Sequence, residues 1–183
     1  MPTPEKTSRE RIIAAGRDLL EAGGPQGLTM QSVAERVGVR APSLYKHIDN
    51  RAALLTAVAE ATIDDLLARL TSTDGSLEAL VHGFRQFART WPEGFRLMHS
   101  AQAPPEALAR VAAPVLRASR ELVGEQEALD AARLVTAWAS GFLGMELIGA
   151  FRFGGDIDRA FEYGLAGIRR ALTTGHQSAG TTP

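Results

Sequence analysis

Apolar positions recur with the 3.6-residue period of an α-helix along most of the chain, and no long alternation of apolar and polar residues marks a strand. This pattern predicts an all-α fold. The first helix is expected to begin near Thr7, because Thr7 and Glu10 have the spacing of a capping box. It should end in the Gly/Pro-rich segment 23–27. Further helices are expected at residues 29–37, 40–48, 51–70, 77–90, 93–100, 106–123, 126–153 and 157–172.

The breaks between these helices divide the chain into three parts. Residues 1–50 hold the first three short helices, and residues 51–172 form a larger helical domain. The loop at 71–76 is a further candidate boundary, because it is built from Thr, Ser, Asp and Gly. Residues 173–183 are rich in Gly, Ser and Thr and are expected to form a flexible tail.

Residues 29–48 have the pattern of a helix-turn-helix. Thr29 is a good N-cap for its first helix. Gly38 stands where the chain must turn, and glycine enters the left-handed conformation at little cost. Pro42 suits the first turn of the second helix, from which Leu44 and Ile48 face back toward the first. The first helix places four apolar residues on one face: Met30, Val33, Ala34 and Val37.

The opposite face of the second helix is polar and basic. We expect it to present Arg40, Ala41, Ser43, Lys46 and His47. A helix of this kind can enter the DNA major groove, where its side chains donate hydrogen bonds to phosphates and base edges. The alternative interpretation is a surface helical hairpin with a solvated basic face, and the spacing alone leaves that alternative open.

Composition excludes several other classes of protein. The 183 residues contain no cysteine, which excludes disulfide scaffolds, thiol catalysis and iron–sulfur clusters. The net charge is −1, so the basic helix is a local feature of a neutral chain. The polar first ten residues lack the apolar stretch of a signal peptide, and charged residues interrupt the apolar segment 131–151. We therefore expect a cytoplasmic protein without a membrane span.

The chain also lacks the signatures of an enzyme. No Gly-x-Ser-x-Gly elbow, phosphate-binding loop or dinucleotide fingerprint occurs, and His82 and His99 have no cysteine partners that would suggest a metal site. We expect neither a catalytic site nor a metal or other cofactor.

Residues 29–55 resemble the DNA-binding domain of the tetracycline-repressor (TetR) family of bacterial regulators. The resemblance rests on Ala34, on Gly38 and Val39, on the run Leu-Tyr-Lys-His-Ile at 44–48 and on the run Arg-Ala-Ala-Leu-Leu at 51–55. Residues 12–29 are also similar to the family's first helix. The family resemblance implies a transcriptional regulator with an N-terminal helix-turn-helix domain and a C-terminal helical domain for effector binding and dimerisation.

The resemblance also implies roles for single residues. Tyr45 and His47 match residues that touch phosphates, and Arg51 matches a basic residue that grips the DNA backbone. Thr29 and Ser43 match hydroxyl positions near phosphates. Positions that vary in the family and face base edges are matched by Gln31, Arg40, Ala41 and Lys46. Loss of the Arg51 side chain is expected to weaken binding to all sequences alike and to flatten its salt dependence by about one unit.

One such domain buries too little surface for strong specific binding, so a homodimer on a palindromic operator in double-stranded DNA is expected. The predicted helices 126–153 and 157–172 are the candidate dimer surface, because the first is apolar on more than one face. Gly141, Gly144 and Gly149 would permit close helix approach. A wholly intrachain core is the alternative.

The segment 138–151 resembles one C-terminal subtype of the family. That subtype usually has a His-Gly pair where this chain has Ser140 and Gly141. The difference removes the histidine on which the usual role of the pair depends.

Aromatic residues crowd into residues 77–100, which suggests a pocket for a small-molecule effector. The candidate lining is Phe84, Phe87, Trp91, Phe95, Met98 and His99, with Trp138, Phe142 and Glu146 as a far wall. The alternative is that the same aromatic stripe is ordinary core.

The resemblance implies a mechanism in which an effector acts through the helix that begins at residue 51. The reading helices then no longer match the spacing of the DNA grooves, and the repressor leaves its operator. Two other interpretations remain. The chain could be a small-molecule-binding or catalytic bundle with a vestigial helix-turn-helix, or an activator or silencer that needs no effector.

Overall fold

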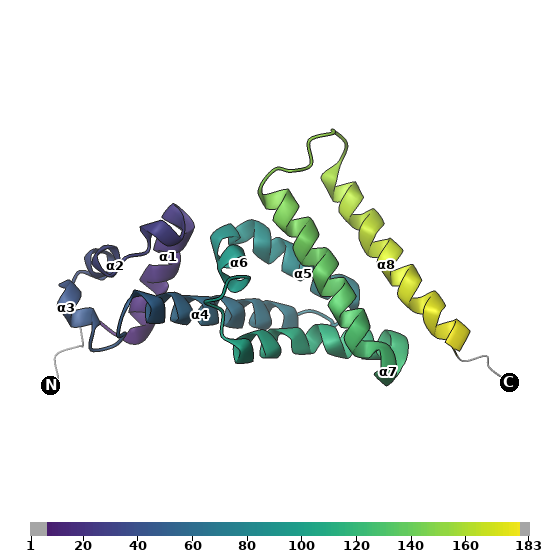
Figure 1. Ribbon diagram of the computed structural model, residues 1–183, viewed down its shortest axis with the longest axis horizontal. Coiled ribbons are helices and arrows are strands. Elements are labelled where there is room, and N and C mark those ends of the chain that lie inside the picture. The colour runs from purple at the N-terminus through teal and green to yellow at the C-terminus, as the bar shows by residue number, and fades with distance from the viewer. Residues whose placement is uncertain (1–6, 180–183) are drawn as a thin grey trace. The chain divides into compact units, whose positions relative to one another are not determined.

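The computed structural model describes residues 7–179, with the backbone alone for 175–179. Every regular element among these residues is a helix, which confirms the all-α prediction (Figure 1). The helices are α1 (Arg9–Gly27), α2 (Met30–Val37), α3 (Ala41–Leu44), α4 (Arg51–Thr71), α5 (Leu77–Thr90), α6 (Pro92–Met98), α7 (Pro105–Leu147) and α8 (Ile157–Ala179).

The predicted helix breaks coincide with glycines in the left-handed region. Gly24 interrupts α1 at φ 63°, and a short turn continues to Gly27. Gly124 interrupts α7 at φ 77°, so the two helices predicted there are two segments on either side of a kink. No helix among the described residues has an apolar stretch that could cross a membrane.

Several predicted ends were wrong. The first helix begins at Arg9 and is capped by Ser8, whose hydroxyl accepts from the Arg11 amide, and not by the expected box of Thr7 and Glu10. The helix expected at 40–48 is α-helical only over Ala41–Leu44, because the amide of His47 bonds to the Leu44 carbonyl in a tighter turn. The helix expected to reach 153 ends at Leu147, where Gly149 at φ 63° closes the last turn. The expected tail is helical from 173 to 179 as the continuation of α8. Residues 180–183 of that tail lie outside the described residues.

The described residues form two compact units. The first contains the chain up to Leu67 together with Thr90–Val111, and the second contains Ala68–Arg89 together with the chain from Ala112. This division does not follow the expected boundary at residue 50. The reason is packing: Leu54, Leu55 and Val58 of α4 lie in the same core cluster as the helices before them.

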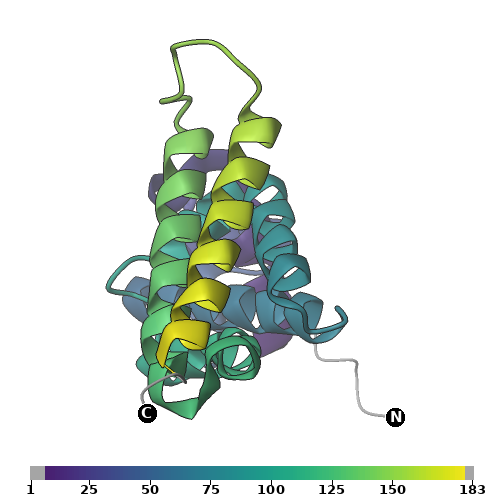
Figure 2. The same cartoon turned by 90° about the vertical axis from the view of Figure 1, so that its right-hand side faces the viewer.

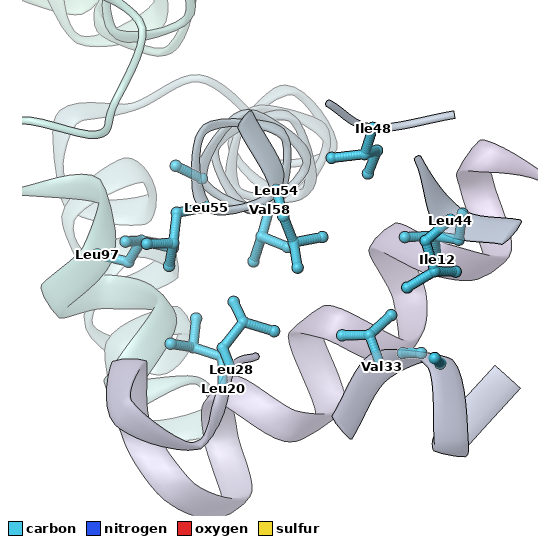
Figure 3. Packing of buried hydrophobic residues seen from close by; sticks show 13 residues of the cluster. Ile12, Leu20, Leu28, Val33, Leu44, Ile48, Leu54, Leu55, Val58 and Leu97 are labelled. Carbon is cyan, nitrogen blue, oxygen red and sulfur yellow. The ribbon is translucent and has the colours of Figure 1, made fainter. Parts of the chain in front are cut away.

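The core of the first unit joins α1, α2, α3, the first part of α4 and α6 (Figure 3). Gly16 of α1 allows a close approach, because a Cβ there would lie 2.9 Å from Val58. The labelled side chains of this cluster are Ile12, Leu20, Leu28, Val33, Leu44, Ile48, Leu54, Leu55, Val58 and Leu97.

In the second unit, the last part of α7 and α8 run side by side (Figures 1 and 2). Their packing depends on Gly164, since a Cβ at that position would lie 2.6 Å from the Trp138 ring. Phe161 of α8 is fully buried and its ring centroid lies 5.2 Å from that of Trp138. This pair of helices carries the candidate dimer surface.

Candidate nucleic-acid interface and effector region

The start of α2 is fixed by a capping box. The Thr29 hydroxyl accepts a hydrogen bond from the Ser32 amide, and the Ser32 hydroxyl accepts one from the Thr29 amide, each at 3.0 Å. The two bonds satisfy donors that the first turn of a helix leaves without partners. The sequence therefore sets where the first helix of the helix-turn-helix begins.

The turn after α2 is set by Gly38, as predicted. Gly38 lies at φ 81° and ψ 35°, and the amides of Gly38 and Val39 both bond to the Ala34 carbonyl at 2.9 Å. Such a left-handed cap satisfies the last carbonyls of the helix and redirects the chain. Val39 then packs against the core cluster. The turn between α2 and α3 is thus specified locally.

The α3 region, which is residues 40–48, has a buried inner face, because Leu44 is fully covered and Ile48 is 4% exposed. Its outer face carries the predicted polar residues. Arg40 and Lys46 are exposed, Tyr45 is 51% exposed, and Ser43 and His47 are half-buried. The segment thus presents a cationic and aromatic surface to solvent, which an anionic polymer can approach.

Three predicted contact residues also have partners within the protein. Ala41 packs partly against the core cluster. The amide group of Gln31 donates to Glu35 at 2.7 Å, and the Thr29 hydroxyl belongs to the capping box. Ala41 therefore offers little surface, whereas Gln31 and Thr29 remain exposed at the start of α2.

Arg51 departs most from its expected place. Its Nε donates to the Leu28 carbonyl at 2.8 Å, and its Nη2 donates to the Pro25 carbonyl. Pro25 lies in the last turn of α1 and Leu28 is the residue that follows that helix. Sequence reasoning missed this contact, because nothing in the pattern marks a carbonyl 23 or 26 residues away as a partner.

Four of the predicted pocket residues, Trp91, Phe95, Met98 and His99, belong to the first unit, at or beside α6. Phe95 and Met98 are buried there, and the Phe95 and His99 rings lie 4.6 Å apart. The Arg17 guanidinium lies over the Trp91 ring at 5.6 Å. The structure therefore places these residues around α6, in contact with α1.

A carboxylate of α1 caps the start of α6. Glu21 accepts hydrogen bonds from the amide of Gly94 at 2.6 Å and from the amide of Glu93 at 3.2 Å. A Cβ at Gly94 would lie 2.9 Å from the Thr62 side chain of α4, so only glycine permits this approach. Three helices of the first unit therefore meet at Gly94.

The other five predicted pocket residues, Phe84, Phe87, Trp138, Phe142 and Glu146, belong to the second unit. Phe87 is fully buried and Phe84 is half-buried on α5. The rings of Trp138 and Phe142 both contact the Phe161 ring at a centroid distance of 5.2 Å, the first in a tilted and the second in an edge-to-face arrangement. The predicted pocket residues are thus divided between the two units.

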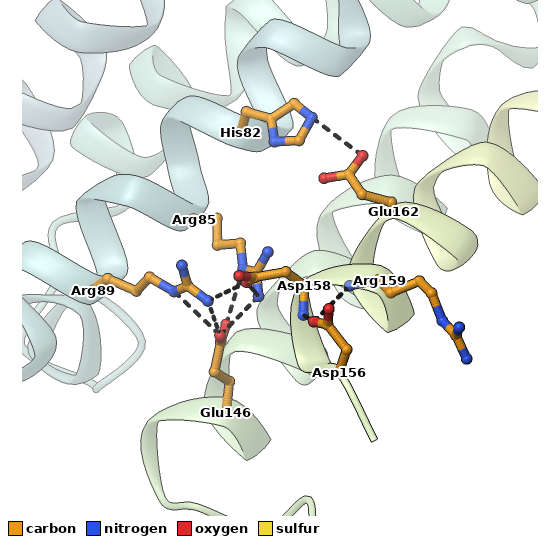
Figure 4. Close-up of polar contacts among 8 residues, drawn as sticks. All are labelled: His82, Arg85, Arg89, Glu146, Asp156, Asp158, Arg159 and Glu162. Atoms are coloured by element: carbon orange, nitrogen blue, oxygen red, sulfur yellow. Dashed lines mark hydrogen bonds and ion pairs between the residues drawn. The ribbon is translucent and has the colours of Figure 1, made fainter. Parts of the chain in front are cut away.

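Glu146 is the centre of an ion-pair network that joins α5, α7 and α8 (Figure 4). Arg85 and Arg89 both donate to its carboxylate, and both also contact Asp158. Burial alone would raise the pKa of Glu146, but the hydrogen bonds from the two guanidinium groups outweigh it and lower that pKa. Glu146 is therefore an ionised partner of arginines.

Arg85 and Phe161 were not identified from the sequence. The Arg85 side chain is only 7% exposed, and its guanidinium lies 4.2 Å from the centre of the Phe161 ring. Arginine commonly takes this position over an aromatic face. The signal that could have shown it is the pair Arg85 and Arg89, one helical turn apart within the aromatic stripe of α5.

Large apolar side chains are exposed along the last part of α7, the following loop and α8. These side chains are Leu129, Leu134, Met145, Ile148, Phe153 and Tyr163. A Cβ at Gly141 or Gly144 would meet nothing within 4 Å, so both glycines border open space. Gly149, which was expected to permit helix approach, instead ends α7.

A metal site is not formed anywhere in the described part of the chain, since no three His, Asp or Glu side chains group together there.

Known families match both parts of the chain. Residues 12–58 match the bacterial regulatory proteins, tetR family, and residues 77–168 match the tetracyclin repressor-like C-terminal domain. The uncharacterised HTH-type transcriptional regulator Rv0681 of Mycobacterium tuberculosis is 31% identical over 160 residues, covering 80% of this chain and 73% of that protein.

The tetracycline repressors themselves match over a shorter stretch. The class C repressor of Escherichia coli is 35% identical over 104 residues, which cover 54% of this chain and 47% of the repressor. The chain thus spans about half the length of that relative. Among solved structures, a TetR variant of Acinetobacter baumannii in complex with minocycline superimposes with a TM-score of 0.72 at 26% identity, covering 97% of each chain.

Proposed function

Because the chain belongs to the TetR family of transcriptional regulators, which bind DNA and are not enzymes, we propose that it is a homodimeric repressor released from a palindromic operator by a small-molecule effector. The observation that carries this proposal is the outer surface of the α3 region, which is cationic and aromatic and stands on a turn fixed by Gly38. Acting on operator DNA, the protein would work in the cytoplasm.

The residues of this surface divide by the chemistry they offer to DNA. Tyr45 and His47 would donate to phosphates, and the hydroxyls of Thr29 and Ser43 lie where they could add further phosphate contacts. Base edges would be read by the long side chains at the outer face, since Arg, Lys and Gln form the common major-groove pairs. These side chains are Gln31, Arg40 and Lys46, with the methyl group of Ala41 beside them.

The second unit would supply the dimer contact. Leu134, Met145 and Ile148 are exposed and recur at helical spacing on the face of α7 that also holds Gly141. Exposed apolar side chains that gather on one face commonly mark interfaces. Gly141 and Gly144 on that face would let two α7 helices approach closely. A two-fold axis there would present two α3 regions to successive turns of a palindrome.

The effector would act on α6. The minocycline complex of the Acinetobacter baumannii TetR shows that a related protein binds a small molecule. In this chain α6 carries Phe95 and Met98 and is bonded to α1 through Glu21. A ligand that displaced α6 would therefore act on α1 and α4, which support the helix-turn-helix, and operator DNA should weaken effector binding in return.

Gel retardation with the intergenic DNA beside the gene tests the proposal. A repressor of this kind retards that DNA, and the retardation declines steeply as salt is raised. A purified protein that sediments as a monomer and ignores its own promoter region would contradict the proposal. An activator would bind DNA in the same way. A transcription assay on the same DNA therefore decides whether the protein represses or activates transcription.

A further inference from the structure

The connection between α1 and α2, which here means the turn after Gly24 together with Leu28, is held by side chains from α2 and α4. After the break at Gly24, the carbonyl of Gly27 accepts from the Ser32 hydroxyl at 2.9 Å. The carbonyl of Leu28 accepts from Nε of Arg51 at 2.8 Å, and that of Pro25 accepts from Nη2 of the same side chain. The Arg51 side chain therefore links the start of α4 to this connection through two hydrogen bonds.

Electrostatics explains why the arginine lies there. The last carbonyls of a helix carry partial negative charge and favour a cation, yet the last turn of α1 has no basic residue of its own. Arg51 is the first residue of α4, where the positive end of that helix disfavours a cation. Its guanidinium is thus better placed on the α1 carbonyls than over its own helix.

The attachment acts at the point that sets the helix-turn-helix. Leu28 is fully buried in the core cluster, and the next residue, Thr29, caps α2. Fixing the Pro25 and Leu28 carbonyls relative to α4 therefore fixes where α2 begins. The Gly38 turn then transmits that position to α3.

We infer that Arg51 is a positioning residue for DNA recognition: it holds the helix-turn-helix against α4 and thereby sets discrimination between the operator and other DNA. This role rests on DNA binding by α2 and α3. It differs from a phosphate contact, which would use the guanidinium as a charge and would leave discrimination unchanged.

The Arg51→Lys variant separates the two roles. Lysine keeps the positive charge that a phosphate contact needs, but its single ammonium group cannot reproduce the planar fork that spans two carbonyls. Affinities of the full-length wild type, Arg51→Lys and Arg51→Ala are measured by fluorescence anisotropy over a series of salt concentrations. The probes are the duplex that the wild type protects and a duplex of random sequence.

A matched control calibrates the salt series. Lys46 is exposed on the outer face of the α3 region, and the structure gives its side chain no ion pair among the described residues. Its positive charge lies at the DNA whether it contacts a base edge or a neighbouring phosphate. Replacement of Lys46 by alanine should therefore make the fall of log affinity with log salt less steep, by up to about 0.9. A change of this size shows that the salt series can detect the loss of one cationic side chain at the DNA.

The positioning role predicts that Arg51→Lys loses affinity for the operator by about tenfold with an unchanged salt slope, and that it loses much less for random DNA. Wild-type affinity in Arg51→Lys, with a flattened slope in Arg51→Ala, would overturn the inference in favour of a phosphate contact. Equal losses on both duplexes, with a lowered unfolding midpoint, would also overturn it, because Arg51 would then serve folding alone. Failure of DNA binding itself is recognised separately, since the wild type would then raise the fluorescence anisotropy of neither duplex.

Discussion

The Arg85 guanidinium donates two hydrogen bonds to the Glu146 carboxylate, from Nε to Oε2 at 3.1 Å and from Nη2 to Oε1 at 2.8 Å. This forked geometry joins α5 to the last part of α7, and Arg89 and Asp158 extend it to α8 (Figure 4). Because Arg85 is almost completely buried, the carboxylate is its compensating charge.

Replacement of Glu146 by glutamine should therefore destabilise the protein. The amide removes the buried negative charge and leaves Arg85, which lies against Phe161, with only the exposed Asp158 carboxylate as a counter-charge. This loss should cost about 2–3 kcal/mol of unfolding free energy. Urea denaturation followed by the fluorescence of Trp91 and Trp138 at a fixed protomer concentration measures the change. The control is Asp130→Asn, which breaks the exposed pair with Arg133 and should leave the midpoint unchanged. Equal midpoints for Glu146→Gln and wild type would refute the structural role.

The same network predicts acid sensitivity. Burial opposes ionisation of Glu146, but the bonds from Arg85 and Arg89 lower its pKa below the ordinary value of 4.5, and the bond from Arg89 lowers the pKa of Asp158 below 3.8. A depressed carboxyl pKa stabilises the folded state above the unfolded pKa, and this stabilisation disappears as pH falls through the folded pKa. The urea midpoint should thus decline from about pH 4.5 downward. Glu146→Gln should show a shallower decline, whereas parallel curves would exclude the network as its source.

Substitution of Gly141 distinguishes a dimer formed through α7 from a chain in which α7 meets no partner. Gly141 lies in a helix, and a side chain there meets nothing in the single chain. If α7 does not meet a partner, Gly141→Leu should stabilise the protein by about 0.5–1 kcal/mol, because glycine disfavours helix. If two α7 helices approach there, the same change should shift the protein toward monomer in sedimentation equilibrium.

Gly23 of α1 is the matched control for that experiment. It is also helical and exposed, and a Cβ there meets nothing within 4 Å. Gly23→Leu should leave the association state unchanged. A dimer that survives Gly141→Leu would place the interface elsewhere.

The capping box at α2 can be tested in the free protein. Thr29→Ala removes the acceptor of the Ser32 amide and should cost about 1 kcal/mol of unfolding free energy, whereas Thr29→Ser keeps an oxygen in place and should cost less. Urea denaturation of both variants gives the comparison. Identical losses would mean that the Thr29 methyl group, not its hydroxyl, stabilises the start of α2.

The sequence predicted the helix-turn-helix well because its signals are local. The cap at Thr29, the apolar face of α2 and the left-handed turn at Gly38 each depend on residues only a few positions apart. The same locality explains the correct break near Gly24 and the kink at Gly124. The end of α3 at Leu44 has no such residue to mark it, because the chain there passes into a tighter turn without a glycine or proline.

Long-range side-chain contacts were beyond the sequence. Arg51 reaches carbonyls more than 20 residues away, Glu21 caps a helix 72 residues later, and Arg85 pairs with a carboxylate 61 residues later. The pattern showed that these residues were charged but not which partner neutralised them. The aromatic stripe likewise could not separate pocket from core, and Phe87 proved to be fully buried.

The central claim is that a homodimer contacts DNA through the outer surfaces of its two α3 regions. A nuclease footprint on the intergenic DNA beside the gene tests this claim most directly. The account predicts two protected half-sites with their centres about one helical turn apart and related by a dyad, and it predicts that Lys46→Ala and Tyr45→Ala weaken the protection of both halves together. Uniform or absent protection by the wild type, or an unchanged footprint in both variants, would contradict it.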